Sequence, residues 1–116
     1  MKVEDWFKKG TKFDIKKLRY LKPPKLPYFL YTNEIEYKGA DLSNNLAENN
    51  IVIERYSQTD NEKDKTDIKI VNDFLNIVFQ GSSKTYKVRT EWLDLEKLYG
   101  TFWVLDPILE KIRKED

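Results

Sequence analysis

The segment Pro23–Tyr31, in which three prolines lead into four consecutive large apolar residues, constrains the fold of this chain most strongly. Proline cannot donate a hydrogen bond to a neighbouring strand, so Pro27 fits only the first residue or the edge of a strand. The residues that follow it, Tyr28–Tyr31, are typical of a buried strand. The segment therefore predicts the entrance to a core strand, which can continue to Tyr37.

A short helix is expected over residues 2–9, before this strand. Its apolar face consists of Val3, Trp6 and Phe7. Gly10 follows two lysines, as expected at a helix end where cations complement the dipole. Residues 11–22 fit neither the helix nor the strand period cleanly, and a short edge strand near Leu18–Leu21 is the preferred interpretation.

A long helix is expected in the middle of the chain. Thr59–Glu62 has the pattern of a capping box, in which the hydroxyl and the carboxylate satisfy each other's backbone amides. Gly81 stands where a left-handed residue ends a helix. The broad apolar stripe between them consists of Ile68, Ile70, Val71, Phe74, Leu75, Ile77 and Val78.

Three further strands are expected, over Asn50–Ser57, Lys84–Trp92 and Leu98–Leu105, with a polar loop at Gly39–Asn45. The last two strands are separated by the short link 93–97, which predicts an antiparallel hairpin. Alternation places two sets of side chains on the hairpin. The set expected under the helix is Tyr86, Val88, Thr90, Trp92, Tyr99, Thr101, Trp103 and Leu105, and the set expected on the other face includes Phe102 and Val104.

The resulting order, α-β-β-α-β-β, predicts an α+β fold. We expect a mainly antiparallel sheet of about four strands, with the long helix and the short N-terminal helix packed on it. Residues 1–116 form one domain, large enough to bury roughly two-thirds of its unfolded surface. The tail 106–116 is expected to add one helical turn around Ile108, Leu109 and Ile112.

The chain contains neither histidine nor cysteine. These residues supply the usual general acid–base, most zinc ligands and the thiol nucleophile, so an enzyme, a cofactor and a metal site are not expected. A cluster of Glu91, Asp94 and Glu96 could provide oxygen ligands or carboxylate catalysis. A solvated hairpin turn is the favoured interpretation, because acidic turn residues are common.

Charge is distributed unevenly along the chain. Residues 1–27 carry nine Lys/Arg against three Asp/Glu, whereas the whole chain has a net charge of +1. A nucleic-acid-binding module is therefore the alternative function, with the basic segment and the aromatic side chains of the strands as its surface. It is disfavoured because lysine dominates the segment, whereas phosphate and base recognition more often use arginine.

The order and spacing of several short motifs resemble the small tail-completion or head–tail joining proteins of long-tailed phages and Gram-positive prophages. The resemblance covers roughly residues 3–105. The motifs that carry it are Pro27–Tyr31, Tyr37–Asp41, Ile51–Ser57 and Thr90–Tyr99. It implies a non-enzymatic structural subunit that assembles, often as a hexameric ring, and docks to other tail or connector proteins.

The expected interaction surface has two parts that rest on different grounds. The resemblance implies loop contacts, here Tyr37, Lys38, Asp41 and Leu42. Phe102 and Val104 are included because helices that cover one face of the sheet leave apolar side chains exposed on the other. The expected location is the virion, and the host bacterial cytoplasm during assembly. No apolar run approaches the roughly 20 residues of a membrane span, so no membrane partner is expected.

Overall fold

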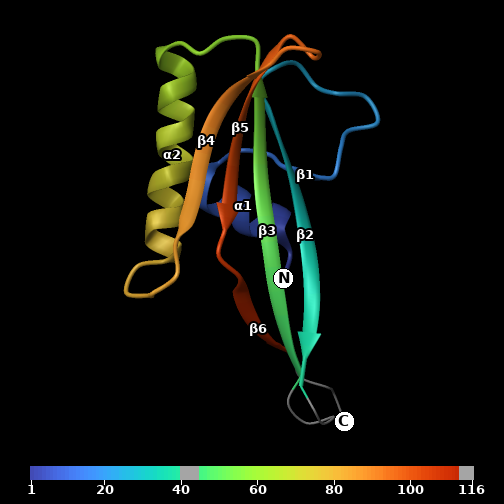
Figure 1. Cartoon of the computed structure of the whole chain (residues 1–116), viewed down its shortest axis with the longest axis vertical. Coiled ribbons are helices and arrows are strands. Elements are labelled where there is room, and N and C mark those ends of the chain that lie inside the picture. The colour runs from blue at the N-terminus through green and yellow to red at the C-terminus, as the bar shows by residue number, and fades with distance from the viewer. Residues whose placement is uncertain (40–44, 113–116) are drawn as a thin grey trace.

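The computed structural model describes residues 1–39 and 45–112. Within these residues the chain forms two helices and six strands, shown in Figure 1. In chain order they are α1 (Val3–Thr11), β1 (Lys16–Lys17), β2 (Tyr28–Lys38), β3 (Asn45–Ser57), α2 (Glu62–Val78), β4 (Tyr86–Leu93), β5 (Leu98–Leu105) and β6 (Ile108–Ile112). None of the described helices is long and apolar enough to cross a membrane.

The strands form one sheet in the order β1-β2-β3-β5-β4. All neighbours on this path are antiparallel except β1 and β2. β3 is long enough for two partners on the same side, since Val52–Ser57 pairs with β5 and Asn45–Asn49 pairs with β6. The predicted α+β fold and mainly antiparallel sheet are confirmed, but the sheet has six strands among the described residues rather than about four.

The two additional strands fall where the sequence predicted something else. The edge strand is Lys16–Lys17, not Leu18–Leu21, because Leu18 adopts a left-handed backbone (φ 67°) that ends the pairing. The tail does not form a helical turn at Ile108–Ile112. It is extended because the half of β3 that lies beyond β5 offers it a row of backbone hydrogen-bond partners.

The prediction of a strand directly after Pro27 is confirmed, and the strand runs to Lys38. β2 begins at Tyr28, directly after Pro27, and pairs with β3 over its whole length, from Tyr28 opposite Tyr56 to Lys38 opposite Leu46. The expected start of β3 at Asn50 was too late. Its buried Asn49 accepts from Asn33 Nδ2 (2.9 Å) and donates to the Ile108 carbonyl (3.1 Å), which satisfies a polar group inside the extended hairpin.

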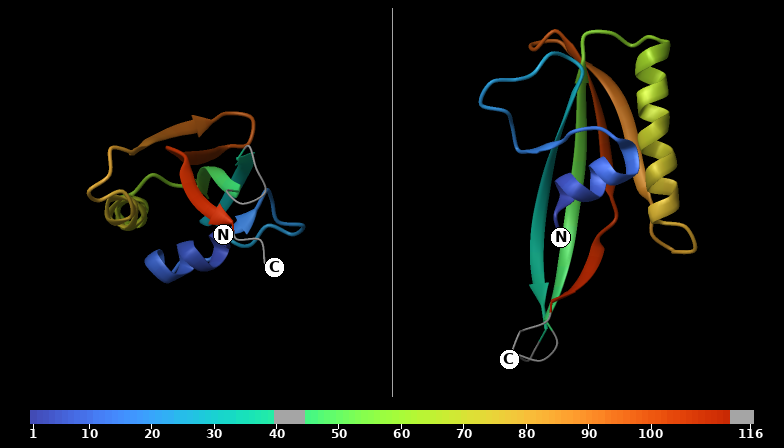
Figure 2. Two further views of the ribbon diagram at one scale, coloured as in Figure 1. Left: turned by 90° about the horizontal axis from the view of Figure 1, so that it is seen from below. Right: turned by 180° about the vertical axis from the view of Figure 1, so that it is seen from behind.

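Both helices lie on one face of the sheet, α2 over its β5 side and α1 over its β2 side (Figure 2). The side chains between these two layers form the hydrophobic core. Its buried members are Val3, Phe7, Ile15, Phe29, Tyr31, Ile51, Ile53, Val71, Leu75, Trp103 and Leu105. Because strand side chains alternate, every second residue of each strand points to the opposite face, on which neither helix lies.

Gly10 allows the two helices to approach each other. It does not end α1, which runs to Thr11 and is followed by Lys12 in the left-handed region (φ 70°). A β-carbon at position 10 would lie 2.1 Å from the ring of Phe74 in α2. That ring packs edge-on against Trp6 (4.8 Å between ring centroids) and Phe7 (6.1 Å), so it has little room to move away.

Gly10→Ala is therefore expected to destabilise the protein, although the same change in an open helix stabilises by about 0.5–1 kcal/mol. We expect a loss of about 1–3 kcal/mol in the free energy of unfolding, measured by urea denaturation, because the methyl group overpacks the contact between the helices. Lys9→Ala, one residue away and exposed, is the control and should change little. A Gly10→Ala protein as stable as the parent would contradict the close approach.

The start of α2 is held by a buried charge on β3. Arg55, 2% exposed, contacts Asp64 Oδ1 (2.9 Å) and Asp67 Oδ2 (2.8 Å) through Nη2. Asp64 also accepts hydrogen bonds from Ser57, Thr59 and the Asn61 amide. The capping box is formed by Asn61 and Asp64, not by Thr59 and Glu62, because the helix begins at Glu62 and Asn61 therefore occupies the N-cap position.

Replacing Arg55 by Met tests this ion-pair network. The variant leaves two carboxylates near the core without their cation, so we expect the free energy of unfolding to fall by about 3–5 kcal/mol. The control is Lys69→Met, which removes an exposed pair with Asp73 (2.6 Å) and should cost no more than about 0.5 kcal/mol. Equal losses for the two variants in urea denaturation would show that burial of Arg55 contributes nothing.

Stability should also fall at acid pH through Asp64. Burial alone would raise the pKa of this carboxyl, but the hydrogen bonds from Thr59, the Asn61 amide, Ser57 and Arg55 outweigh burial and hold the pKa well below its usual range. A carboxyl whose pKa is lower in the folded state stabilises fully above its unfolded pKa of about 3.9 and loses that contribution as the pH falls. Unfolding measured between about pH 5 and 2 should therefore depend less on pH in Asp64→Asn than in the parent, and identical slopes would contradict this role.

Candidate docking face of the sheet

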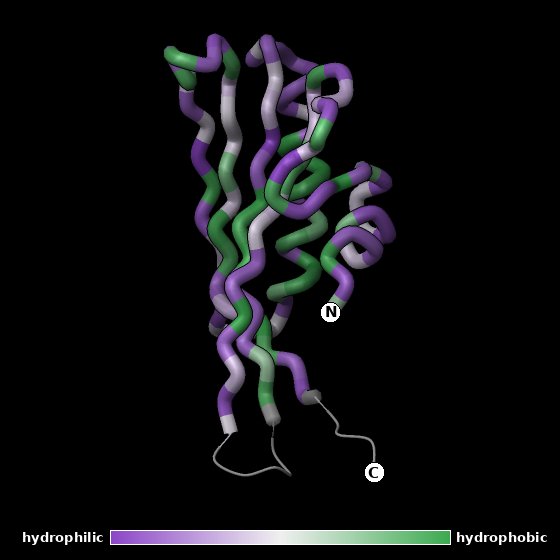
Figure 3. The backbone as a smooth tube through the Cα atoms, turned by 90° about the vertical axis from the view of Figure 1, so that its right-hand side faces the viewer, coloured by the Kyte–Doolittle hydropathy of each residue, from purple (hydrophilic) through white to green (hydrophobic). Residues whose placement is uncertain are grey.

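The sheet face opposite the helices, which we call the open face, is the candidate functional site. It is formed by the even-numbered residues of β2, β3 and β5 and the odd-numbered residues of β4, because the register pairs Leu30 with Glu54, Glu54 with Phe102 and Phe102 with Arg89. Hydrophobic and hydrophilic positions alternate along these strands (Figure 3). The strands therefore present a second set of side chains outside the core.

A row of aromatic side chains crosses the open face from β2 to β5, directly from Tyr28 to Tyr56 and diagonally from Tyr56 to Phe102. The ring centroids are 5.6 Å apart between Tyr28 and Tyr56 and 6.2 Å apart between Tyr56 and Phe102. Tyr20, from the loop after β1, extends the row at 5.5 Å from Tyr28. At the other end the guanidinium of Arg89 lies 4.7 Å from the centre of the Phe102 ring, a cation–π contact.

The row has a polar margin on β3. The Tyr56 hydroxyl donates to the Glu54 carboxylate. Burial, followed by this hydrogen bond and the negative charge of Glu54, raises the pKa of Tyr56 above its ordinary value. At neutral pH Tyr56 is thus a protonated donor whose single proton is already engaged, so its ring and the lone pairs of its oxygen are the groups left for a partner.

The charges around the row do not favour nucleic acid. The open-face positions of β2–β5 carry both signs, with carboxylates in excess. The cations are Lys38, Lys87 and Arg89, and the carboxylates are Glu34, Glu36, Glu48, Glu54 and Glu91. Binding of a phosphate backbone requires a cationic surface, so aromatic stacking here would have to overcome repulsion.

The predicted interaction surface is divided by the structure. Phe102 and Val104 lie together on the open face, and Val104 is 43% exposed. Tyr37 is 72% exposed, but strand alternation puts it on the helix-covered side of the sheet, near the far end of β2. The neighbouring Lys38 forms an ion pair with Glu48. The other two predicted residues, Asp41 and Leu42, lie outside the described residues.

Sequence reasoning missed the rest of the row. Tyr28 was expected in a buried strand, and Tyr56 and Arg89 were not singled out at all. Alternation alone separates the two faces of each strand, but the alignment of Tyr28, Tyr56 and Phe102 needs the register between strands that are far apart in sequence. The signal available in the sequence is strand alternation: Glu54 and Tyr56 are two residues apart, which puts both on the strand face away from Ile53.

The expected helix-covered face of the hairpin is correct for β5 and only partly correct for β4. Trp103 is fully buried, and its indole nitrogen donates to Asn72 Oδ1 of α2 (2.8 Å). Trp92 on β4, also expected in the core, is 47% exposed. The reason is its position near the end of β4, next to the hairpin turn, where it packs edge-on against Tyr99 (4.9 Å) rather than under the helix.

The acidic residues of the hairpin and a pocket beside β2 were the remaining places to look for a reactive site. Among residues 1–39 and 45–112, no group of three or more potential metal ligands comes together, and Asp94 instead contacts Lys97 Nζ (3.2 Å). A pocket of about 880 Å³ lies beside the start of β2. Its walls carry charges of both signs, from Lys16, Lys17 and Lys63 and from Glu4, Asp14 and Asp67. The pocket therefore does not present the one sign of charge that would attract a charged substrate.

Comparison of the chain with protein-family models and with curated proteins gives no match. The case for the open face therefore rests on the structure alone. It is an aromatic row bordered by charges of both signs, on a sheet whose other face packs against two helices.

Proposed function

We propose that this chain is a non-enzymatic structural protein of a phage or prophage, acting in tail completion or head–tail joining. The observation that carries the proposal is the one-sided sheet, because an apolar row that no helix covers is typical of a surface that binds another protein. The motif order along the chain, which resembles that of phage assembly proteins, supplies the biological setting.

The composition of the open face fits a protein partner. Interface centres are enriched in aromatic residues and arginine, and a polar border surrounds them. Here Tyr28, Tyr56 and Phe102 form the centre, Arg89 lies over its end, and Val104 extends it along β5. An aromatic or aliphatic side chain of a neighbouring virion protein can bury this row, while its polar groups pair with Glu54 and Lys87.

The partners proposed on the resemblance are other tail or connector proteins and further copies of the chain in a ring, with a hexamer favoured. No cofactor takes part in this function. The proposed locations are the virion and, during assembly, the host bacterial cytoplasm. Rings of this kind hold neighbouring proteins in place, which requires binding surfaces but no catalytic residues.

Particle assembly after deletion of the gene tests the proposal. We expect non-infectious particles with unjoined heads and tails or with unfinished tails, visible by electron microscopy. Restoring the gene on a plasmid should restore infectivity. Normal tailed, infectious particles without the gene would contradict the proposed function.

Val104→Glu tests the open face within the same experiment. Docking would have to remove the new carboxylate from water, so we expect the plasmid-borne variant to restore infectivity roughly tenfold less well than the parent gene, or worse. Ile77→Glu, an equally polar change at an exposed site on α2, is the control and should restore it fully. Circular dichroism should show that both variants fold, and full rescue by Val104→Glu would contradict docking through this face.

A further inference from the structure

The outer edge of β4 has backbone groups available for another strand. β4 is the last strand of the sheet order, and β5 is its one partner strand among the described residues. The Asp106 amide donates to the Thr85 carbonyl (2.9 Å), so Thr85 and every second residue after it direct their backbone groups toward β5. The alternate residues Tyr86, Val88, Thr90 and Trp92 therefore direct N–H and C=O outward.

We propose that β4 pairs with β4 of a second copy of this chain, antiparallel, about a two-fold axis at Thr90. The pairing joins two sheets into one continuous sheet, with the helices of both copies on the same face. This inference goes beyond the proposed function, because it concerns the free protein and uses a strand edge rather than the open face. An unpaired strand edge is a template that proteins cover or block, and a second copy covers it completely.

Charge selects the register of this pairing. With the axis at Thr90, Arg89 lies opposite Glu91 of the second copy, and the contact occurs twice. These residues form non-hydrogen-bonded pairs, in which facing side chains come closest. A shift of one residue at the axis places Arg89 opposite Arg89, or Glu91 opposite Glu91, and like charges directly opposite each other are destabilising.

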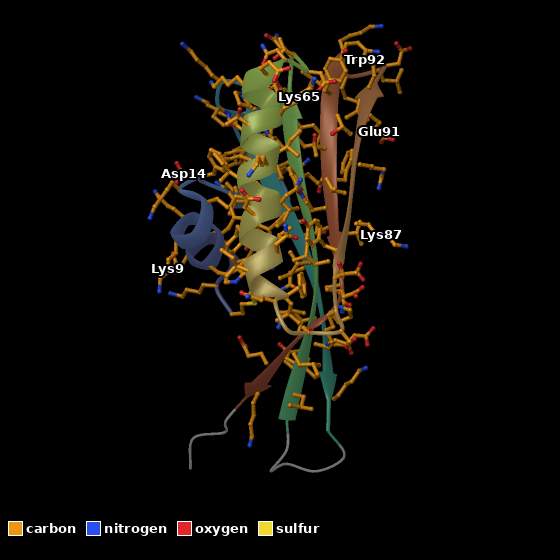
Figure 4. All side chains as sticks on the ribbon, turned by 90° about the vertical axis from the view of Figure 1, so that its left-hand side faces the viewer. Lys9, Asp14, Lys65, Lys87, Glu91 and Trp92 are labelled. Carbon is orange, nitrogen blue, oxygen red and sulfur yellow. The ribbon has the colours of Figure 1, made fainter. Side chains whose placement is uncertain are left out.

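The two groups are already positioned on the correct face in a single chain. Arg89 lies over Phe102, and its Nε is 3.7 Å from Glu91 Oε2 in an exposed pair. Lys87 and Glu91 point away from α2 in Figure 4, so neither helix blocks access to them. Exposed pairs within one strand contribute little, which leaves both charges available to a neighbouring strand.

The apolar residues of β4 match in the same register. Val88 is 41% exposed and Trp92 is 47% exposed, both on the helix side of the strand. The axis at Thr90 places Val88 opposite Trp92 of the second copy, again twice. Figure 4 shows Trp92 at the end of β4. The pairing thus buries the two large apolar side chains that β4 leaves exposed.

Charge reversal and its swap test the pairing, with sedimentation analysis of the full chain over a range of concentrations. The parent should dimerise, and Arg89→Glu or Glu91→Arg alone should raise the dissociation constant roughly tenfold or more, because each places like charges opposite each other. The double variant Arg89→Glu/Glu91→Arg should restore the dimer. Lys9→Glu on α1 should leave it unchanged.

A single cysteine tests the axis itself, since the chain contains no cysteine of its own. Facing residues of a hydrogen-bonded pair lie about 5.5 Å apart at Cα, within the range that a disulfide spans, so Thr90→Cys should form a covalent dimer on oxidation. Lys87→Cys is the control, because its two copies would lie roughly 20 Å apart along the strand.

Three results would overturn the proposal. One is a parent chain that stays monomeric at all concentrations tested. The second is a charge swap that fails to restore the dimer. The third is cross-linking through Lys87→Cys but not through Thr90→Cys. Each is independent of particle assembly, so a failure here leaves the proposed function untouched, and a failure there leaves this pairing untouched.

Discussion

The buried contact of Arg55 with Asp64 and Asp67 is the interaction on which the arrangement of the molecule depends. A charged side chain among apolar residues is costly unless its partners are in place, so β3 and the first turn of α2 can pack in few relative positions. The Asp64 carboxylate also accepts hydrogen bonds from Ser57, Thr59 and the Asn61 backbone amide, which holds the link between β3 and α2 in place as well. The network therefore determines which face of the sheet α2 covers.

A second link fixes α1 on the same face. The Tyr31 hydroxyl of β2 donates to Glu4 of α1, and the close contact at Gly10 sets α1 against α2. Because both helices lie on one side of the sheet, neither helix packs on the half-buried aromatic row of the other side. The proposed function follows from this asymmetry, since stability is built on one face and the other face is left for partners.

Much of the fold was predictable because it depends on local patterns. The strand after Pro27, the stripe of α2 and the hairpin of β4 and β5 are each encoded within about 20 residues. The failures involve contacts between distant segments. β6 forms because half of β3 has no other partner on that side among the described residues, and Arg55 is buried because Asp64 and Asp67 of α2 contact it from the first turns of the helix.

The candidate site was predictable only in part for the same reason. Phe102 and Val104 were placed on an uncovered face from the alternation of one strand. Their neighbours Tyr28 and Tyr56 join them through the register of β2, β3 and β5, which no single segment of the sequence contains. Trp92 was misplaced because alternation gives the face of a residue but does not show where along the strand the helix cover stops.

We propose that another protein occupies the open face in the finished particle. Hydroxyl-radical footprinting can compare the chain free in solution with the chain within purified particles. We expect Tyr28, Tyr56, Phe102 and Val104 to be labelled in the free protein and protected in the particle. Ile77 on α2 serves as the reference for an exposed side chain away from that face. Equal labelling of the open-face residues in both states would show that no protein docks there.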